Sequence, residues 1–377
     1  MDYFTDVKPS GRFYSYICAI HPKLRTPMRL LVDDKIPYIR PALDLLPAEV
    51  VYLSAPDFTP DAVREADALL VRTRTRCDRS LLEGSRVCFI ATATIGHDHI
   101  DAEYCRSQGI EWANAPGCNA ASVCQYVVST LLWWSRCRGR SLRGLHLGVV
   151  GVGHVGRLVA EAARELGMEV LLNDPPRQRE EGEGFVGLDE VATQCDVLTF
   201  HVPLTTEGAD ATHHLADECF LAGLHRRPLL INTSRGEVVD GAALHRALDA
   251  GWVSDAVLDV WEHEPKIDLA LLDKVFLGTP HIAGYSADGK ANASRIVLEA
   301  LCRRWGWTVP GEVLPPDPPV IDIHAASWEE AALQAYNPHT DSLALKSHPE
   351  DFELLRGHYP LRRELRAYRL NLVPRVE

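Results

Sequence analysis

Residues 147–156 read Leu-Gly-Val-Val-Gly-Val-Gly-His-Val-Gly. The apolar run predicts a strand, and the glycines that follow have the spacing Gly-x-Gly-x-x-Gly. A helical segment over residues 157–166, a second strand over residues 168–172 and Asp174 complete the pattern. The glycine pattern alone is weak support, but a strand, helix and acid in register with it predict the dinucleotide-binding unit of a Rossmann fold.

Each glycine of this unit has a separate role. Gly151 permits a tight turn, Gly153 lets the backbone approach a pyrophosphate, and Gly156 lets the helix pack closely on the strand. The free N–H groups at the start of the helix, at His154 and Val155, are expected to face the phosphates.

Asp174 follows Gly156 by 18 residues. An acid at this distance binds the hydroxyls of the adenosine ribose. Its charge would repel a 2′-phosphate, which favours NAD over NADP, although Arg177 is close enough to weaken that preference.

The composition excludes several kinds of partner. Of the 377 residues, 46% are hydrophobic and 24% charged, as is typical of a soluble globular protein. No apolar run approaches the ~18 residues that cross a membrane. The net charge is −13 and no basic block stands out, which argues against nucleic acid. We therefore expect a cytoplasmic protein with a small-molecule ligand.

The ten cysteines are scattered, without the C-x-x-C spacing of zinc sites. Several, such as Cys88, Cys124 and Cys195, stand in apolar runs, so we expect buried free thiols. His97 and His99 have no third ligand nearby, and we expect no metal site.

The whole chain predicts an α/β protein with two Rossmann-like, doubly wound parallel-sheet domains, a cleft between them, and a small C-terminal α+β domain. Residues 28–120 and 283–308 are assigned to a substrate-binding domain, and residues 121–282 to an NAD-binding domain. A proline-rich linker opens the third domain, residues 309–377. Residues 1–27 contain no secretory signal; they are expected to be either a mis-assigned upstream extension, with Met28 the true start, or a short ordered arm.

Three polar residues follow predicted strands of the NAD-binding domain: Arg235, Glu264 and His281. The carboxyl ends of parallel strands meet at one edge, so these side chains are expected to share a crevice. An arginine can bind a carboxylate with two hydrogen bonds. A histidine can take the proton of a hydroxyl while hydride leaves the same carbon, and a glutamate can hold the far imidazole nitrogen.

Three segments around these residues resemble the signatures of the D-isomer-specific 2-hydroxyacid dehydrogenases. They are Asn232-Thr233-Ser234-Arg235-Gly236, Asp259-Val260-Trp261-Glu262-His263-Glu264-Pro265 and Thr279-Pro280-His281-Ile282-Ala283-Gly284. The threonine pattern of residues 91–101, residues 115–120 and the turn at residues 173–176 resemble one member of this family, and the resemblance implies oxidation of a phosphorylated 2-hydroxy acid. The tail, with Arg356, Tyr359 and residues 362–364, resembles the dimerisation domain of that member.

The resemblance implies NAD as cofactor, a homodimer formed through the C-terminal domain, and a set of site residues. Arg235, Glu264 and His281 are implied as catalytic. Thr73, Thr94 and Tyr285 are implied to contact the substrate. The implied NAD contacts, beside the glycine turn, are Asp174, Thr199, Thr233, Ser234, Arg235, Asp259 and Gly284.

Other functions remain open at the level of sequence. One is a related dehydrogenase that acts on phosphoglycerate or glyoxylate, because only details of the cleft separate such enzymes. Another is an NAD-sensing, corepressor-like binding protein, which can retain the arginine, glutamate and histidine. A methyltransferase would use the glycine turn but leave those three residues unexplained.

Overall fold

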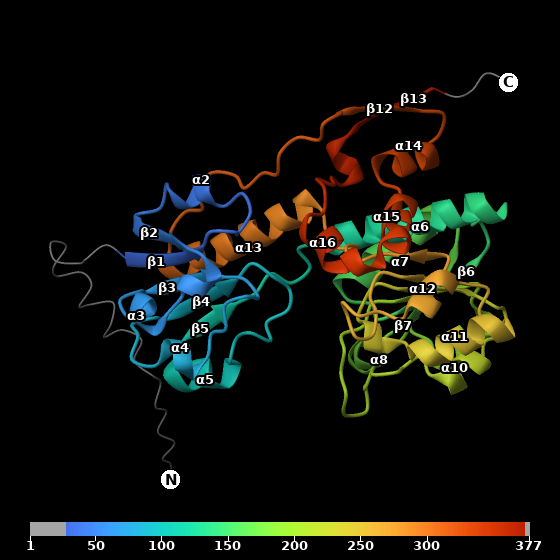
Figure 1. The fold of residues 1–377 in the computed structure, drawn as a ribbon, viewed down its shortest axis with the longest axis horizontal. Coiled ribbons are helices and arrows are strands. Elements are labelled where there is room, and N and C mark those ends of the chain that lie inside the picture. Colours follow the sequence, from blue (N-terminus) through green and yellow to red (C-terminus); the bar gives the residue numbers. More distant parts are fainter. Residues whose placement is uncertain (1–27, 374–377) are drawn as a thin grey trace, which may run out of the picture. The chain divides into compact units, whose positions relative to one another are not determined.

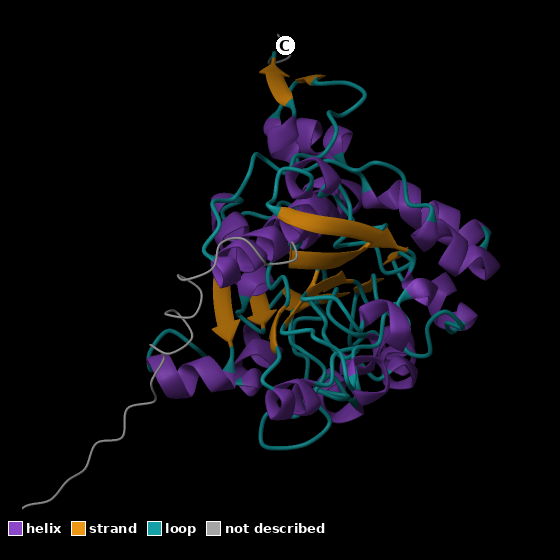
Figure 2. Ribbon diagram, turned by 90° about the vertical axis from the view of Figure 1, so that its left-hand side faces the viewer, coloured by secondary structure: helices purple, strands orange, loops and turns teal. Residues whose placement is uncertain are grey.

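The computed structural model describes residues 28–373, so the alternatives for residues 1–27 lie outside the described part of the chain. The chain forms two compact units. Among the described residues, unit 1 comprises residues 28–114 and Val297–Glu312, and unit 2 comprises Ala115–Ile296 and residues 313–373. Each unit contains its own parallel sheet, and Figure 2 draws the strands in orange.

The sheet of unit 1 is parallel throughout, in the order β2-β1-β3-β4-β5. Its strands are β1 (Met28–Asp33), β2 (Ala48–Leu53), β3 (Ala68–Val71), β4 (Phe89–Thr92) and β5 (Glu111–Ala113). All residues of β3 and β4 are buried, as expected where helices cover both faces of a parallel sheet. The intervening helices are α2 (Arg40–Leu43), η1 (Ala55–Asp57), α3 (Pro60–Val63), α4 (Arg79–Leu82) and α5 (Ala102–Gln108).

The sheet of unit 2 has six parallel strands in the order β11-β10-β9-β8-β6-β7. They are β6 (His146–Val150), β7 (Glu169–Asn173), β8 (Val197–Phe200), β9 (Leu229–Asn232), β10 (Asp255–Leu258) and β11 (Leu277–Gly278). From β6 the chain goes outward to β7 and then returns to β8 on the other side. The order of strands therefore reverses at β6, and ligands of such sheets bind at the carboxyl ends of the strands at this point.

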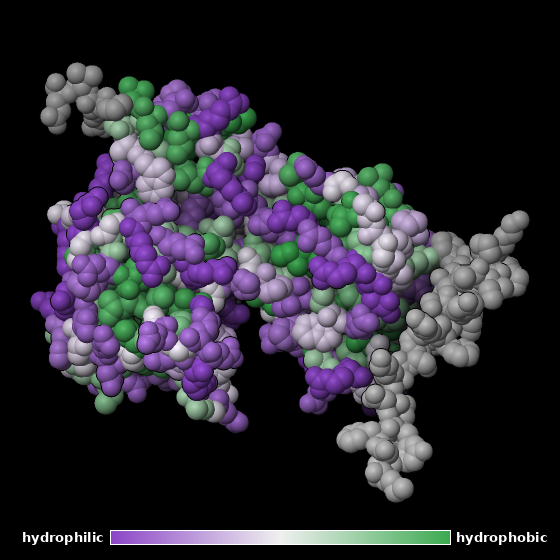
Figure 3. Space-filling view, turned by 180° about the vertical axis from the view of Figure 1, so that it is seen from behind, coloured by the Kyte–Doolittle hydropathy of each residue, from purple (hydrophilic) through white to green (hydrophobic). Residues whose placement is uncertain are grey.

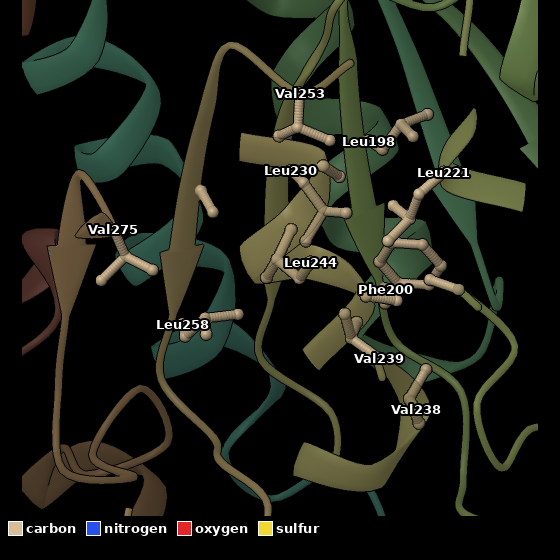
Figure 4. Packing of buried hydrophobic residues seen from close by; sticks show 14 of the residues in the cluster. Leu198, Phe200, Leu221, Leu230, Val238, Val239, Leu244, Val253, Leu258 and Val275 are labelled. Atoms are coloured by element: carbon tan, nitrogen blue, oxygen red, sulfur yellow. The ribbon is translucent and has the colours of Figure 1, made fainter. Parts of the chain in front are cut away.

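Helices pack on both faces of this sheet (Figure 1). They are α6 (Ala120–Arg138), α7 (His154–Glu165), α8 (Pro175–Glu181), α9 (Leu188–Gln194), α10 (Glu218–Ala222), η2 (Gly236–Val238), α11 (Gly241–Ala250) and α12 (Leu269–Lys274). Leu198, Leu230 and Leu258, from three neighbouring strands, point to the same face, where Leu244 of α11 meets them (Figure 4). The long helix α13 (Ala287–Trp305) begins in unit 2 and ends in unit 1.

The C-terminal tail, residues 313–373, belongs to unit 2. Its elements are β12 (Asp322–Ala325), α14 (Trp328–Ala335), α15 (Pro338–Ser347), η3 (Pro349–Asp351), α16 (Phe352–Gly357), η4 (Leu365–Ala367) and β13 (Arg369–Leu372). Helix α15 covers the edge strand β11, where the Gly278 N–H donates to Ser342 Oγ at 3.0 Å. Leu345 and Phe352 are fully buried in the core of unit 2, so the tail is part of that core.

The predicted α/β fold with two parallel sheets is confirmed, with local differences. The first helix of the Rossmann unit begins at His154 rather than at residue 157, because Gly153 already serves as its N-cap. The nine cysteines of the described chain are free thiols, but Cys137 and Cys219 are exposed, so the expectation that the thiols are buried is wrong for these two. Among residues 28–373, no helix combines the length and apolarity needed to cross a membrane.

The buried position of Phe352 gives a test of how firmly the tail belongs to unit 2. Phe352→Ala should lower the free energy of unfolding of unit 2 by about 3–5 kcal/mol, because it removes a core ring and leaves a cavity. Urea unfolding followed by tryptophan fluorescence measures this change. Leu354→Ala is the matched control, since Leu354 lies two residues away but is 53% exposed and should change stability little. Equal effects of the two substitutions would contradict the packing of the tail.

Candidate active site

A cavity of about 330 Å³ opens where the strand order of unit 2 reverses. It lies at the carboxyl ends of β6, β7 and β8. Its lining includes Gly151, Gly153, Asp174, His201, Pro203, Thr205 and Thr212. The glycine turn and the acid that the sequence predicts for a dinucleotide thus line one cavity, which has the position expected for such a ligand.

The three glycines of the turn differ in their surroundings. Gly151 has a left-handed backbone, with φ of 88°. A Cβ on Gly156 would lie 2.0 Å from the Gly151 carbonyl oxygen, so only glycine lets α7 start this close to β6. A Cβ on Gly153 would meet nothing within 4 Å, and this open side is where a ligand can approach the backbone. His154 and Val155 form the first turn of α7.

The Asp174 carboxylate stabilises the glycine turn through a hydrogen bond. Its carboxylate accepts from the Val152 N–H at 2.8 Å and, as N-cap of α8, from the Arg177 N–H at 3.1 Å. The Arg177 guanidinium pairs with Glu181 at 2.6 Å. Because Glu181 offsets its charge, Arg177 is less able to attract a 2′-phosphate, which supports the predicted preference for NAD.

His201 is a site residue that the sequence reading missed. Its ring lines the cavity and lies between two predicted NAD contacts, 3.0 Å from Thr199 Oγ1 and 3.2 Å from Thr233 Oγ1. Burial lowers the pKa of His201 to about 3, so the ring is neutral at neutral pH and serves as a hydrogen-bond partner. His201 directly follows β8, so the rule that site residues follow strand ends could have found it. Thr199 itself is fully buried and reaches the cavity through this ring.

Glu264 and His281 lie together beyond β10 and β11. Glu264 Oε2 is 2.9 Å from His281 Nδ1, and Glu264 Oε1 accepts from the Trp261 N–H at 2.9 Å. A carboxylate on Nδ1 fixes the tautomer and the orientation of the ring. Nε2 is then the nitrogen that can exchange a proton with a ligand.

The backbone of His281 is held by Asp259. His281 has a left-handed conformation, with φ of 57°, and its N–H donates to the Asp259 carbonyl at 2.7 Å. The Asp259 carboxylate, 1% exposed, accepts from the Ile282 N–H at 2.8 Å and the Ala283 N–H at 2.9 Å. Burial raises the pKa of Asp259 against the opposing effect of these donors. Asp259, a predicted NAD contact, is thus an internal support of the turn that carries His281.

Arg235 lies on an adjacent loop, after β9. Its side chain is exposed, and Nη1 donates to the Ser234 carbonyl at 2.7 Å. Ser234 is itself anchored on Asn232 Oδ1 at 2.8 Å. A Cβ on Gly236 would lie 2.0 Å from the Trp261 carbonyl carbon, so the Arg235 loop touches the loop that leads to Glu264. The three predicted catalytic residues therefore stand on contacting loops at one sheet edge.

The predicted substrate contacts are divided between the units. Tyr285 lies in unit 2, four residues after His281, and its hydroxyl accepts from Arg356 Nε at 3.1 Å. Thr73 and Thr94 lie in unit 1, after the carboxyl ends of the neighbouring strands β3 and β4. Thr73 is exposed, whereas Thr94 donates to the Gly96 carbonyl at 2.9 Å.

Comparisons with known proteins agree with this geometry. Residues 125–283 match the family model "D-isomer specific 2-hydroxyacid dehydrogenase, NAD binding domain". Erythronate-4-phosphate dehydrogenase of Bacteroides fragilis is 58% identical over 91% of this chain and 99% of its own length. The enzyme of that name from Porphyromonas gingivalis is 45% identical over 90% of this chain and 95% of its own length. A solved structure of D-lactate dehydrogenase from Aquifex aeolicus with NAD and lactic acid has a TM-score of 0.57 and 28% identity, covering 74% of this chain and 96% of that one.

The fold, the glycine turn and the Glu264–His281 pair are those of an NAD-dependent dehydrogenase. The chain belongs to the D-isomer specific 2-hydroxyacid dehydrogenases and, within them, to the erythronate-4-phosphate dehydrogenase family.

Gly284 offers a test of whether packing or the cofactor requires a glycine there. A Cβ on Gly284 would lie 2.1 Å from Asn119 Nδ2 but 3.6 Å from Asn119 Cβ. Gly284→Ala should therefore lower the thermal midpoint and weaken NAD binding, and adding Asn119→Ala should restore both. Thermal unfolding and NAD titration of Gly284→Ala, Asn119→Ala and the double variant measure this. If the double variant regains stability but not NAD binding, the cofactor itself requires the glycine.

Proposed function

We propose that this protein oxidises 4-phospho-D-erythronate to 3-hydroxy-2-oxo-4-phosphooxybutanoate with NAD, a step in vitamin B6 (pyridoxine) biosynthesis. The observation that carries the proposal is the Glu264–His281 pair, 2.9 Å apart at the sheet edge that also forms the dinucleotide cavity. The 58% identity to an enzyme named for this substrate supports the choice among 2-hydroxy acids.

Each side chain of the site has a separate role in the reaction. NAD, when bound, supplies a nicotinamide ring that accepts a hydride. Arg235, exposed on its loop, holds the substrate carboxylate through paired hydrogen bonds. His281 takes the hydroxyl proton at Nε2, and Glu264 at Nδ1 stabilises the imidazolium that forms. In the reverse direction His281 returns the proton to the carbonyl oxygen.

The remaining assignments follow from the same proposal. We assign NAD contacts to Gly151, Gly153, Asp174 and Thr233, the last of which lies against His201. Asp259 is assigned to the support of the His281 turn. Thr73, Thr94 and Tyr285 are assigned to the substrate.

The substrate-binding domain is taken as residues 28–120 and 283–308, the NAD-binding domain as 121–282, and the C-terminal domain as 309–377. The free thiols of the described chain fit the reducing cytoplasm, a location that cell fractionation would test.

The test of the proposed function is an NADH absorbance assay on a panel of phosphorylated and plain 2-hydroxy acids. His281→Ala should lower kcat by about 10²- to 10⁴-fold, the usual contribution of a general acid–base group, while NAD still binds. His225→Ala, at an exposed histidine of the same unit, is the control and should leave kcat unchanged.

Three results would overturn the proposed function. Activity on phosphoglycerate or glyoxylate-type substrates without activity on 4-phospho-D-erythronate would assign the protein to a related dehydrogenase. NAD binding without turnover of any acid would indicate a nucleotide-sensing binding protein. Wild-type turnover by His281→Ala would remove the proton-transfer role.

We also propose a homodimer formed through the C-terminal domain. Figure 3 shows hydrophobic side chains gathered over β12 and β13, where Leu372 is 45% and Val373 68% exposed. A two-stranded sheet is marginal alone, and exposed apolar side chains on it favour a partner of the same kind. A second copy of the chain would cover both the two-stranded sheet and the exposed apolar side chains on it.

Sedimentation equilibrium should give twice the chain mass of 41.8 kDa. Leu372→Asp with Val373→Asp should shift the protein to the monomer, because two charges would be buried in the interface. Leu45→Asp, at a side chain 67% exposed in unit 1, is the control and should leave the dimer intact. A wild-type protein of single-chain mass at micromolar concentration would exclude the dimer.

A further inference from the structure

Arg362 is a buried cation of the C-terminal tail, with 5% of its surface exposed. Its guanidinium reaches the turn that follows His281: Nη1 donates to the Ile282 carbonyl at 3.3 Å and Nη2 to the Ala283 carbonyl at 2.5 Å. Nη2 also donates to Ser122 Oγ at 2.7 Å, which anchors the guanidinium on α6. The tail thus contacts the backbone next to the histidine of the Glu264–His281 pair.

Asp259 binds the same two residues, Ile282 and Ala283, through their N–H groups. Its carboxylate accepts from the N–H groups of Ile282 and Ala283, whereas Arg362 donates to their carbonyls. The peptide group between Ile282 and Ala283 therefore bridges the buried carboxylate and the buried guanidinium, because its N–H donates to Asp259 and its carbonyl accepts from Arg362. This arrangement compensates each charge, which would cost several kcal/mol to bury alone.

Arg362 has its own charged and aromatic surroundings. The Tyr336 ring lies 4.3 Å from its guanidinium carbon, and the Tyr336 and Tyr359 hydroxyls both donate to Asp341. Burial alone would lower the pKa of Arg362, but Tyr336, Tyr359 and Asp341 together raise it, so the side chain stays charged. The guanidinium is thus held by hydrogen bonds to Ile282, Ala283 and Ser122 and by contact with the Tyr336 ring.

His281 needs such support because its left-handed backbone is unfavourable for a residue with a Cβ. Such a conformation persists only where the surrounding structure over-determines it. The three backbone bonds to Asp259 fix one side of the turn, and Arg362 fixes the other.

We propose that Arg362 is a positioning residue for the oxidation: through the carbonyls of Ile282 and Ala283 it holds the turn that aims His281 at Glu264 and the substrate. This inference rests on the proposed function, since it assigns Arg362 a role in the proton transfer at His281. It makes the C-terminal tail part of the catalytic apparatus within one chain, apart from any role in dimer formation.

The neighbouring Arg363 supplies a matched control. It is also buried in the tail, at 8% exposure, and pairs with Asp288 at 2.9 Å at the start of α13. It donates to the Pro316 carbonyl but has no hydrogen bond to residues 281–283 among those of the described chain. Loss of Arg363 should weaken the attachment of the tail without freeing the His281 turn.

The experiment compares Arg362→Met, Arg362→Lys and Arg363→Met in the full chain. Arg362→Met should lower kcat by about 10- to 100-fold, because displacement of a catalytic group by about 1 Å costs this much. The NAD dissociation constant should stay near the wild-type value, since the cavity at β6–β8 is untouched. Arg362→Lys should be intermediate because a lysine can replace one of the two hydrogen bonds. Arg363→Met should keep the wild-type kcat.

The pH profile of kcat/KM separates positioning from simple loss of stability. His281 keeps its hydrogen bond to Glu264 only while the two side chains are aligned, so loosening the turn should change the pH dependence of kcat/KM. The profile should change in both Arg362 variants and stay as in the wild type in Arg363→Met. If Arg362→Met folds poorly, Arg362→Lys carries the same comparison.

The failures of the two proposals are distinguishable. If the wild type and His281→Ala behave as proposed but both Arg362 variants keep the wild-type kcat and pH profile, only the positioning role is overturned. The same holds if Arg362→Met and Arg363→Met lose activity equally, with unchanged pH profiles. If the wild type lacks dehydrogenase activity, both proposals fall.

Discussion

The buried carboxylate of Asp259 is the constraint on which the rest of the site depends. It follows β10, is 1% exposed, and receives hydrogen bonds from Thr279 Oγ1 and from the N–H groups of Ile282 and Ala283. Thr279 Oγ1 in turn lies 2.7 Å from the Tyr126 hydroxyl, so the carboxylate is tied to α6 as well. An ionised group this deep is tolerated only with several donors around it, and the donors come from the turn that carries His281. The hydrogen bonds that stabilise the buried carboxylate therefore also fix the backbone of this turn.

The parallel sheet explains why single side chains from distant parts of the sequence form one site. β8, β9, β10 and β11 are consecutive neighbours, so the loops after them lie next to one another at the carboxyl edge. Two contacts join these loops: His201 with Thr233, and Gly236 with the Trp261 carbonyl. The dinucleotide cavity and the Glu264–His281 pair are connected through this series of contacts.

Sequence reasoning was most accurate where local pattern decides structure. The two predicted strands of the Rossmann unit, the apolar run from Leu147 and residues 168–172, agree with β6 and β7 to within one residue, because strands of a parallel sheet appear as short apolar runs bounded by turn residues. The pairing of Glu264 with His281 followed from the strand-end rule together with the chemistry of the two residue types. His201 was missed although it obeys that rule, since a histidine after a strand is also a common core residue. The support role of Asp259 was missed because its donors belong to the following strand and turn.

Arg362 shows the limit of such reasoning. It is separated from Ser122 by 240 positions and from Ala283 by 79, and no local periodicity relates the three. The resemblance assigned the tail to contacts between subunits, and nothing in the pattern of residues 309–377 indicates a contact with the His281 turn. In the folded chain the turn lies between two buried charges of opposite sign, one at a sheet edge and one in the tail. A backbone conformation that neither element could hold alone is stable because both bind the backbone of the same two residues, Ile282 and Ala283. The strand ends supply the reactive side chains, and the tail supplies the constraint that keeps one of them in place.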